Sequence, residues 1–129
     1  MGKCELLAFL LCEKATLGPD RKVTLYDLFD RIIVPRAQAK PKLFFVYYKV
    51  VVKEPCTVSL RVLDSLGREI PGNWRDSLTQ IGPMQAIWAL TSSLFQEPGP
   101  YVLELRQESN DEGALTLATM LFVVDREGE

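Results

Sequence analysis

The fold is decided by residues 42–63, which read KLFFVYYKVVVKEPCTVSLRVL. The first half is rich in aromatic and β-branched residues, which favour strands. In the second half every other residue is apolar, and this period of two is typical of a strand with one face in water. Because the Glu54-Pro55 pair separates the halves, we predict two strands joined by a turn, with residues 42–53 in the middle of a sheet.

Further strands are predicted on both sides of this stretch. Turns rich in Gly, Pro and Asp separate short runs that are either apolar throughout or alternate apolar and polar residues. Asp27 interrupts one run and indicates a bulge or a change of sheet. These further strands cover residues 4–14, 22–26, 27–34, 101–106 and 114–124. The alternation predicts inward side chains at Val58, Leu60, Val62, Tyr101, Leu103 and Leu105.

Residues 84–96 fit two patterns. Their apolar residues have helical spacing, but no helix cap precedes them. The turn EPGP at residues 97–100 follows, and an alternating strand begins directly after it. This order is typical of a hairpin, so we predict a strand over residues 84–96, with Trp88 in the core. Residues 69–83 have the composition of a long exposed loop.

The spacing of these elements predicts the fold class. Seven or eight short strands without a long amphipathic helix indicate an all-β protein, an antiparallel β-sandwich of immunoglobulin-like size. A chain of 129 residues usually has one hydrophobic core, so residues 1–129 are predicted to form a single domain. The Cys-Trp-Cys set of true immunoglobulin domains is absent, which leaves the strand order open.

Several segments resemble one protein family. They are KVTL at residues 22–25, LFDRI at 28–32, LDSLG at 63–67 and FQEPGPYVLEL at 95–105. Together they resemble a family of small uncharacterised bacterial all-β proteins grouped as a domain of unknown function, in which a glycine often stands where this chain has Asp27. The resemblance covers most of the chain and implies a β-sandwich from a bacterial cytoplasm. Its motifs are structural, and it implies no catalytic residue.

Composition argues against several classes of function. The chain has no histidine, which is the commonest general base and metal ligand. Its formal charge is −2 without a long run of like charge, so nucleic acid is not an expected partner. The longest apolar run near the start, residues 6–11, is too short for a signal peptide or a membrane span. We therefore expect a cytoplasmic protein with no cofactor, no metal site and no membrane contact.

No set of residues forms a recognisable catalytic constellation. Cys4, Cys12 and Cys56 have no histidine to activate them and are predicted to be buried apolar side chains. Neither a Ser-x-x-Lys spacing nor a Gly-rich phosphate loop occurs. Aspartates such as Asp64 are interpreted as turn caps, with a histidine-free carboxylate hydrolase as a weaker alternative. We predict that the protein is not an enzyme.

The segment containing Trp74, Arg75 and Asp76 is the candidate partner contact. Trp and Arg are enriched at binding hot spots, and loops on a rigid sandwich commonly carry recognition. If this loop binds a ligand, the protein is a small-ligand or carbohydrate-binding domain. The structural alternative is that Trp74 folds back over an open end of the core.

Surplus apolar surface leads to the main functional prediction. Residues 42–53 and 114–124 are apolar on both faces, whereas a two-layer sandwich wets the outer face of each sheet. Large exposed apolar patches usually mark interfaces. We predict a non-catalytic protein interaction or assembly module of unknown partner. It is expected to form a homo-oligomer through a face or edge of one of these two strands.

Overall fold

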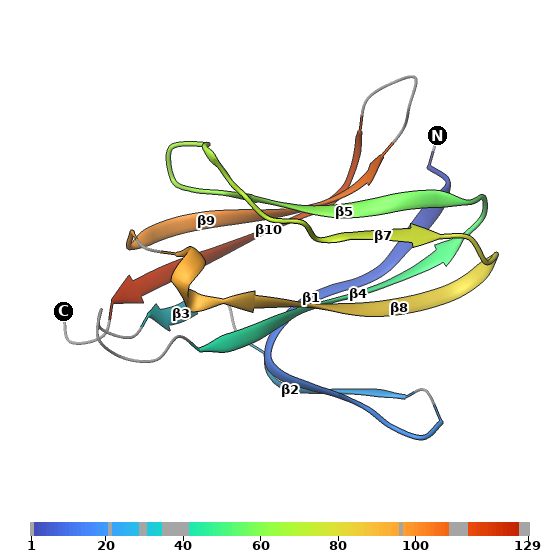
Figure 1. The fold of residues 1–129 in the computed structure, drawn as a ribbon, viewed down its shortest axis with the longest axis horizontal. Helices are drawn as coiled ribbons and strands as arrows, with labels where there is room; N and C mark the ends of the chain where they lie inside the picture. The colour runs from blue at the N-terminus through green and yellow to red at the C-terminus, as the bar shows by residue number, and fades with distance from the viewer. Residues whose placement is uncertain are drawn as a thin grey trace.

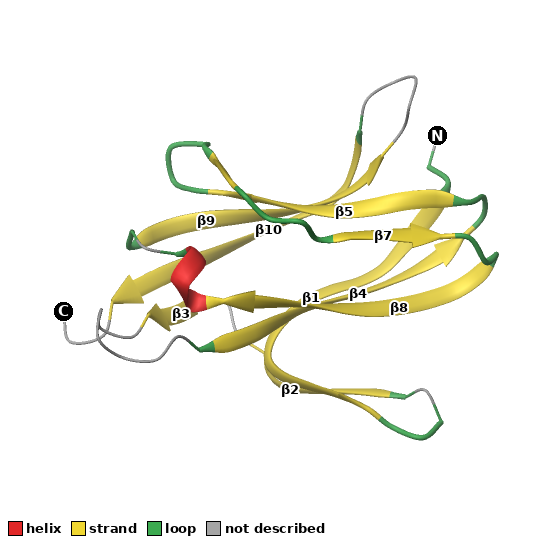
Figure 2. Cartoon of the chain, viewed as in Figure 1, coloured by secondary structure: helices red, strands yellow, loops and turns green. Residues whose placement is uncertain are grey.

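The computed structural model describes residues 2–20, 22–28, 31–34, 42–95, 97–108 and 114–126. Within these ranges the chain forms ten strands and one short 3-10 helix, η1 (Ser92–Leu94). Figure 1 and Figure 2 show the strands arranged in two layers. The predicted all-β sandwich is confirmed. No helix in the described ranges is long and apolar enough to cross a membrane.

The four-stranded sheet has the order β2-β1-β4-β8, with antiparallel pairing between all neighbours. Its strands are β1 (Cys4–Leu17), β2 (Val23–Leu28), β4 (Leu43–Val52) and β8 (Gly82–Thr91). β4 lies between β1 and β8, so the central position predicted for residues 42–53 is confirmed. The β1–β2 hairpin projects from the body on the side of this sheet (Figure 1).

The six-stranded sheet has the order β3-β10-β9-β5-β6, and β7 pairs with a second part of β5. Its strands are β3 (Arg31–Val34), β5 (Cys56–Leu63), β6 (Glu69–Ile70), β7 (Arg75–Leu78), β9 (Gly99–Glu108) and β10 (Leu115–Arg126). β3 runs parallel to β10, and the other neighbours in this sheet are antiparallel.

Alternate residues of the central strands form the core between the sheets. The inner row of β4 consists of Phe44, Val46, Tyr48, Val50 and Val52, all buried. The inward positions predicted on β5 and β9 are also all buried, so their register is confirmed. Phe95 closes one end of the core, with its ring edge-on to Tyr101 at 5.0 Å and to Phe122 at 5.2 Å between centroids. Trp88 is buried as predicted.

The segment predicted as a long loop contains two short strands. Residues 69–83 include β6 and β7, which both pair with β5. The loop prediction was wrong because these strands are short and carry few apolar residues, so the hydrophobic pattern does not reveal them. Pairing with β5 supplies the order that local sequence does not. For the same reason the described chain has ten strands, more than the seven or eight expected.

The chain changes sheet after β2. β2 belongs to the four-stranded sheet and β3 to the six-stranded sheet. The change of sheet therefore lies close to Asp27, where the sequence indicated a bulge or a change of sheet. The strand predicted over residues 84–96 is confirmed as far as Thr91, where η1 begins to turn the chain towards Phe95. Gly67, in the turn after β5, has a φ of 78°, a left-handed conformation that glycine adopts without steric cost.

Leu103→Ala is expected to lower the free energy of unfolding by about 2 to 5 kcal/mol, because it empties a buried site between the sheets. Leu121→Ala is the matched control, since Leu121 lies on the outer face of the neighbouring strand and is 64% exposed. Its cost is expected to stay below about 0.5 kcal/mol. Urea denaturation measures the free energy of unfolding of both variants. Equal losses would contradict the assignment of Leu103 to the inner face and Leu121 to the outer face of the six-stranded sheet.

Candidate functional site

Trp74 bridges the two sheets along one side of the sandwich. Its indole Nε1 donates a hydrogen bond to the backbone oxygen of Ala89 on β8, at 3.1 Å. Its own backbone oxygen accepts a hydrogen bond from the Leu60 nitrogen on β5, at 2.9 Å. The half-buried side chain packs against the core. This placement agrees with the fold-back alternative, and contact between Trp74 and a partner stays a prediction.

Arg75 and Asp76 point to opposite faces of β7. Arg75 forms an ion pair with Glu108 on the outer face of the six-stranded sheet. Asp76 is the cross-strand partner of the buried Val58 and therefore faces the core. The three residues predicted as one contact surface thus lie at three different places around β7. Successive side chains of a strand point to opposite faces, which separates Arg75 from Asp76. The prediction of a loop did not anticipate this separation.

Tyr48 is a buried polar group whose partner the sequence did not reveal. Its hydroxyl donates a hydrogen bond to Oδ2 of Asp76, at 2.5 Å. Burial raises the pKa of Tyr48 above its ordinary value of 10.0, and the hydrogen bond and charge of Asp76 raise it further. A buried phenol usually needs a hydrogen-bond partner, so the sequence could have flagged Tyr48. Only the fold brings Asp76 from 28 positions away.

The outer face of the four-stranded sheet is apolar along two cross-strand rows. One row consists of Leu10, Tyr47 and Ile87, and the next consists of Cys12, Phe45 and Ala89. Tyr47 is 8% exposed and Cys12 is 0% exposed although both point away from the sandwich core, so the chain covers part of this face. Leu43, on the same face of β4, is 61% exposed. The face is therefore partly covered and partly open.

A β-bulge in β1 decides which thiol faces out. The register between β1 and β4 shifts between Leu6 and Ala8, so Leu7 is the extra residue. Positions eight apart on a regular strand share one face, but the bulge reverses this relation. Cys4 therefore lies on the inner face of β1, beside Val52, while Cys12 lies on the outer face.

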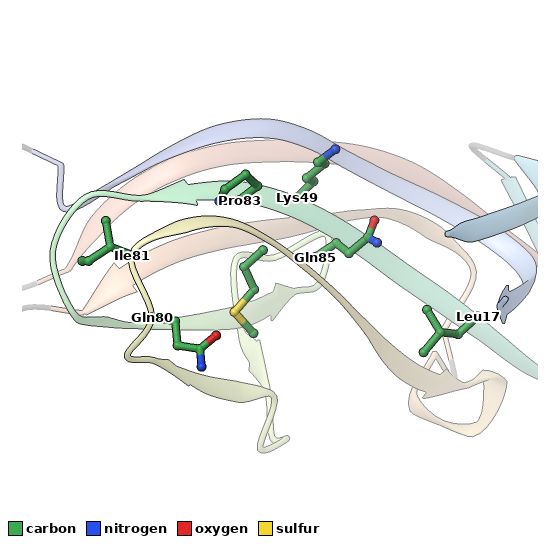
Figure 3. Close-up of a pocket in the computed structure, with 7 residues that line it drawn as sticks. Leu17, Lys49, Gln80, Ile81, Pro83 and Gln85 are labelled. Carbon is green, nitrogen blue, oxygen red and sulfur yellow. The ribbon is translucent and has the colours of Figure 1, made fainter. Parts of the chain in front are cut away.

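A hollow of about 530 Å³ lies beside this outer face (Figure 3). Figure 3 shows Leu17, at the end of β1, and Ile81, before β8, at opposite ends of the hollow. Lys49 and Gln85, which are cross-strand partners on the outer face, also line it. The hydroxyl of Tyr47 donates a hydrogen bond to Oε1 of Gln85 at 2.6 Å. The hollow is thus framed by the hairpin and by the turn before β8.

Comparison with solved structures gives a distant likeness. The chain is similar to the cupredoxin domain of amoB from Nitrosocaldus yellowstonii, with a TM-score of 0.42 and 15% sequence identity. The alignment covers 64% of this chain and 56% of that chain. A likeness at this level gives no residue of this chain a role. Among the residues that the structure describes, no three Cys, Asp or Glu side chains gather as a metal site would require.

No protein-family model matches the chain, and no curated protein matches it. The resemblance to small bacterial all-β proteins therefore stays a prediction. The site has to be interpreted from its own geometry.

Tyr48→Phe is expected to lower the free energy of unfolding by about 1.5 to 3 kcal/mol, because the hydroxyl bonds a carboxylate inside the fold. Tyr47→Phe, on the adjacent position of the same strand, loses a bond to a neutral amide and is expected to cost about 0.5 to 1.5 kcal/mol. Chemical denaturation near neutral pH measures both. A smaller loss for Tyr48→Phe than for Tyr47→Phe would contradict the assigned role of Asp76.

The pH dependence provides a second test of the Tyr48 phenol. Because folding raises the pKa of Tyr48, its stabilisation is fully present below the unfolded pKa of about 10 and is lost as the pH rises towards the folded pKa. Tyr48→Phe has no such titration, so the stability gap between wild type and variant is expected to narrow above about pH 10. A gap that stays constant up to about pH 11 would count against a protonated phenol in the core.

Proposed function

We propose that this chain is a non-catalytic interaction module that self-associates through the outer face of the four-stranded sheet. The observation that carries the proposal is the pair of apolar cross-strand rows on that face. An antiparallel sheet that faces water on one side normally carries polar residues there. Contact between two copies of the same face would remove from water those members of these rows that the chain itself leaves exposed, such as Leu10, as in the two-fold pairing common among soluble oligomers.

The other outer face of the sandwich supports this choice of surface. On the six-stranded sheet Arg61 lies opposite Glu104, and Ser59 lies opposite Arg106. Apolar partners there lie at one end, where Leu63, Val102 and Leu121 form a row and Pro100 pairs with Val123. Charged and hydroxyl side chains suit contact with water, so the two outer faces differ in the surface they offer to a partner.

The open part of the proposed interface lies around two leucines. Leu43 is 61% exposed and Leu10 is 36% exposed, and both point outward from the four-stranded sheet. β4 has a neighbour on each side, so it offers a partner its outer face rather than an edge. A formal charge of −2 per chain gives weak repulsion between two copies.

The titration of the buried groups supports a binding role over a catalytic one. Burial raises the pKa values of the Cys12 thiol and of the Tyr48 phenol. These groups are therefore protonated near neutral pH. A protonated thiol or phenol is a poor nucleophile and a poor general base.

Leu43→Glu is expected to convert the oligomer to monomer, because it places a charge in the open part of the proposed contact, next to the two apolar rows. Leu121→Glu introduces the same charge at a leucine of similar exposure on the opposite outer face, and it is expected to leave the oligomer intact. Sedimentation velocity over a wide concentration range measures the mass of each protein. A wild-type monomer at every concentration would overturn the proposal, as would dissociation by Leu121→Glu alone.

Binding of a small apolar ligand in the hollow is the second candidate. Its volume of about 530 Å³ falls within the usual range for ligand pockets, and Leu17, Ile81 and Met84 supply apolar lining. Trp74 does not line this hollow, so the ligand would not sit at the predicted Trp74 contact. Folded wild type is then expected to enhance the fluorescence of anilinonaphthalene sulfonate, and Ile81→Asp to abolish this. Equal fluorescence with both proteins would exclude this site.

A further inference from the structure

Two cysteines contact the same core cluster at the end of the sandwich where β1 and β5 begin. Cys4 is buried on the inner face of β1, and Cys56, the first residue of β5, packs against the same core cluster. The Lys3 backbone oxygen accepts hydrogen bonds from the nitrogens of Lys53 and Glu54, at 2.8 and 3.0 Å. These bonds hold the residue before Cys4 against the turn that leads into Cys56. The Cys56 thiol is close enough to add to the rise in the pKa of Cys4 that burial causes.

The two thiols differ in access to solvent. Cys56 is half-buried and lines a polar hollow of about 390 Å³, whereas Cys4 is buried. Lys3 and Arg75 line the same hollow, and Arg75 pairs with Glu108 at its rim. Positive charge at the rim of this hollow attracts anionic reactants. Cys56 is thus the thiol that an incoming molecule reaches first.

The surroundings of Cys4 hold its thiol in a fixed position. Its Sγ lies 3.8 Å from Oε1 of the buried Gln107, which also accepts hydrogen bonds from the backbone nitrogens of Lys3 and Cys4. These contacts fix the start of β1 over the β5–β9 pair. A sulfur on Cys56 that has already reacted would therefore have one protein thiol fixed beside it.

We propose that Cys56 and Cys4 form a thiol–disulfide exchange site for small disulfides that carry carboxylates. The Cys56 thiolate attacks one sulfur of the small disulfide, forms a mixed disulfide and releases one small thiol. Cys4 then attacks the Cys56 sulfur and passes its proton to the departing small thiolate, which forms the Cys4–Cys56 bond and releases the second small thiol. Overall the two cysteines lose two electrons and two protons, which the small disulfide gains as two thiols. The new bond would tie the four-stranded sheet to the six-stranded sheet.

The test uses oxidised glutathione as the probe, with acid quenching and peptide mapping by mass spectrometry. In folded wild type we expect a peptide pair joined through Cys4 and Cys56, with Cys12 still a thiol. Cys12 is the internal control because it is 0% exposed and its Sγ lies 3.7 Å from the Phe45 backbone oxygen on the opposite side of the sheet. Cys12→Ala is expected to react like wild type.

Single variants separate the two steps. Cys4→Ala is expected to stop at a stable mixed disulfide on Cys56, and Cys56→Ala is expected to leave both remaining thiols unmodified. A mixed disulfide on Cys56 that persists in wild type would overturn the proposal. So would first reaction at Cys12, or no reaction in the folded chain when the urea-unfolded chain reacts. The wild-type mapping needs no variant, so it decides the question even if Cys4→Ala fails to fold.

This exchange site is independent of the proposed interface. Leu43→Glu, which changes the outer face of the four-stranded sheet, is expected to form the same Cys4–Cys56 bond as wild type.

Discussion

The inner row of β4 is the constraint on which the rest of the structure depends. It presents two aromatic residues and three valines to the space between the sheets, and every member of the row from Phe44 to Val52 is buried. Burying a large apolar side chain contributes about 1.5 to 3 kcal/mol, so a shift of one residue would expose the whole row and is strongly disfavoured. The same register necessarily turns Leu43, Phe45 and Tyr47 outward. The apolar outer face is therefore a direct consequence of how the core is built.

Polar contacts, together with the buried side chain of Leu78, fix β7 against the body. Its sequence contains little hydrophobic signal, yet Asp76 accepts the Tyr48 hydroxyl on the inner side and Arg75 pairs with Glu108 on the outer side. A buried phenol without a partner would cost several kcal/mol, so the Asp76 contact stabilises both β4 and β7. Trp74, just before β7, adds a hydrogen bond to β8 and covers the space between the sheets.

A single bulge in β1 separates the two surfaces to which we assign function. Without the extra residue at Leu7, Cys4 and Cys12 would share one face of the strand. With it, Cys4 faces the core next to Cys56, and Cys12 joins the apolar outer face. The proposed thiol chemistry is thus located at one end of the core, and the proposed self-association on the outside of the four-stranded sheet. The proposed self-association does not involve the Trp74 segment, and the proposed thiol site uses only its Arg75, although residue type alone made that segment the most suggestive one.

The sequence by itself determined the elements whose signal is local. Alternation in β5 and β9 predicted which side chains are buried, and the aromatic and β-branched run predicted that β4 is central, because side-chain period and composition act within a few neighbouring residues. Only the tertiary structure decided that residues 75–78 form a strand, that Asp76 lies beside Tyr48 and that Cys4 lies beside Gln107. Each of these depends on strands that are separated in the chain and meet either by pairing in one sheet or by packing across the core. A local pattern carries no information on which distant residue will occupy the facing position, so these contacts could not be predicted from the sequence.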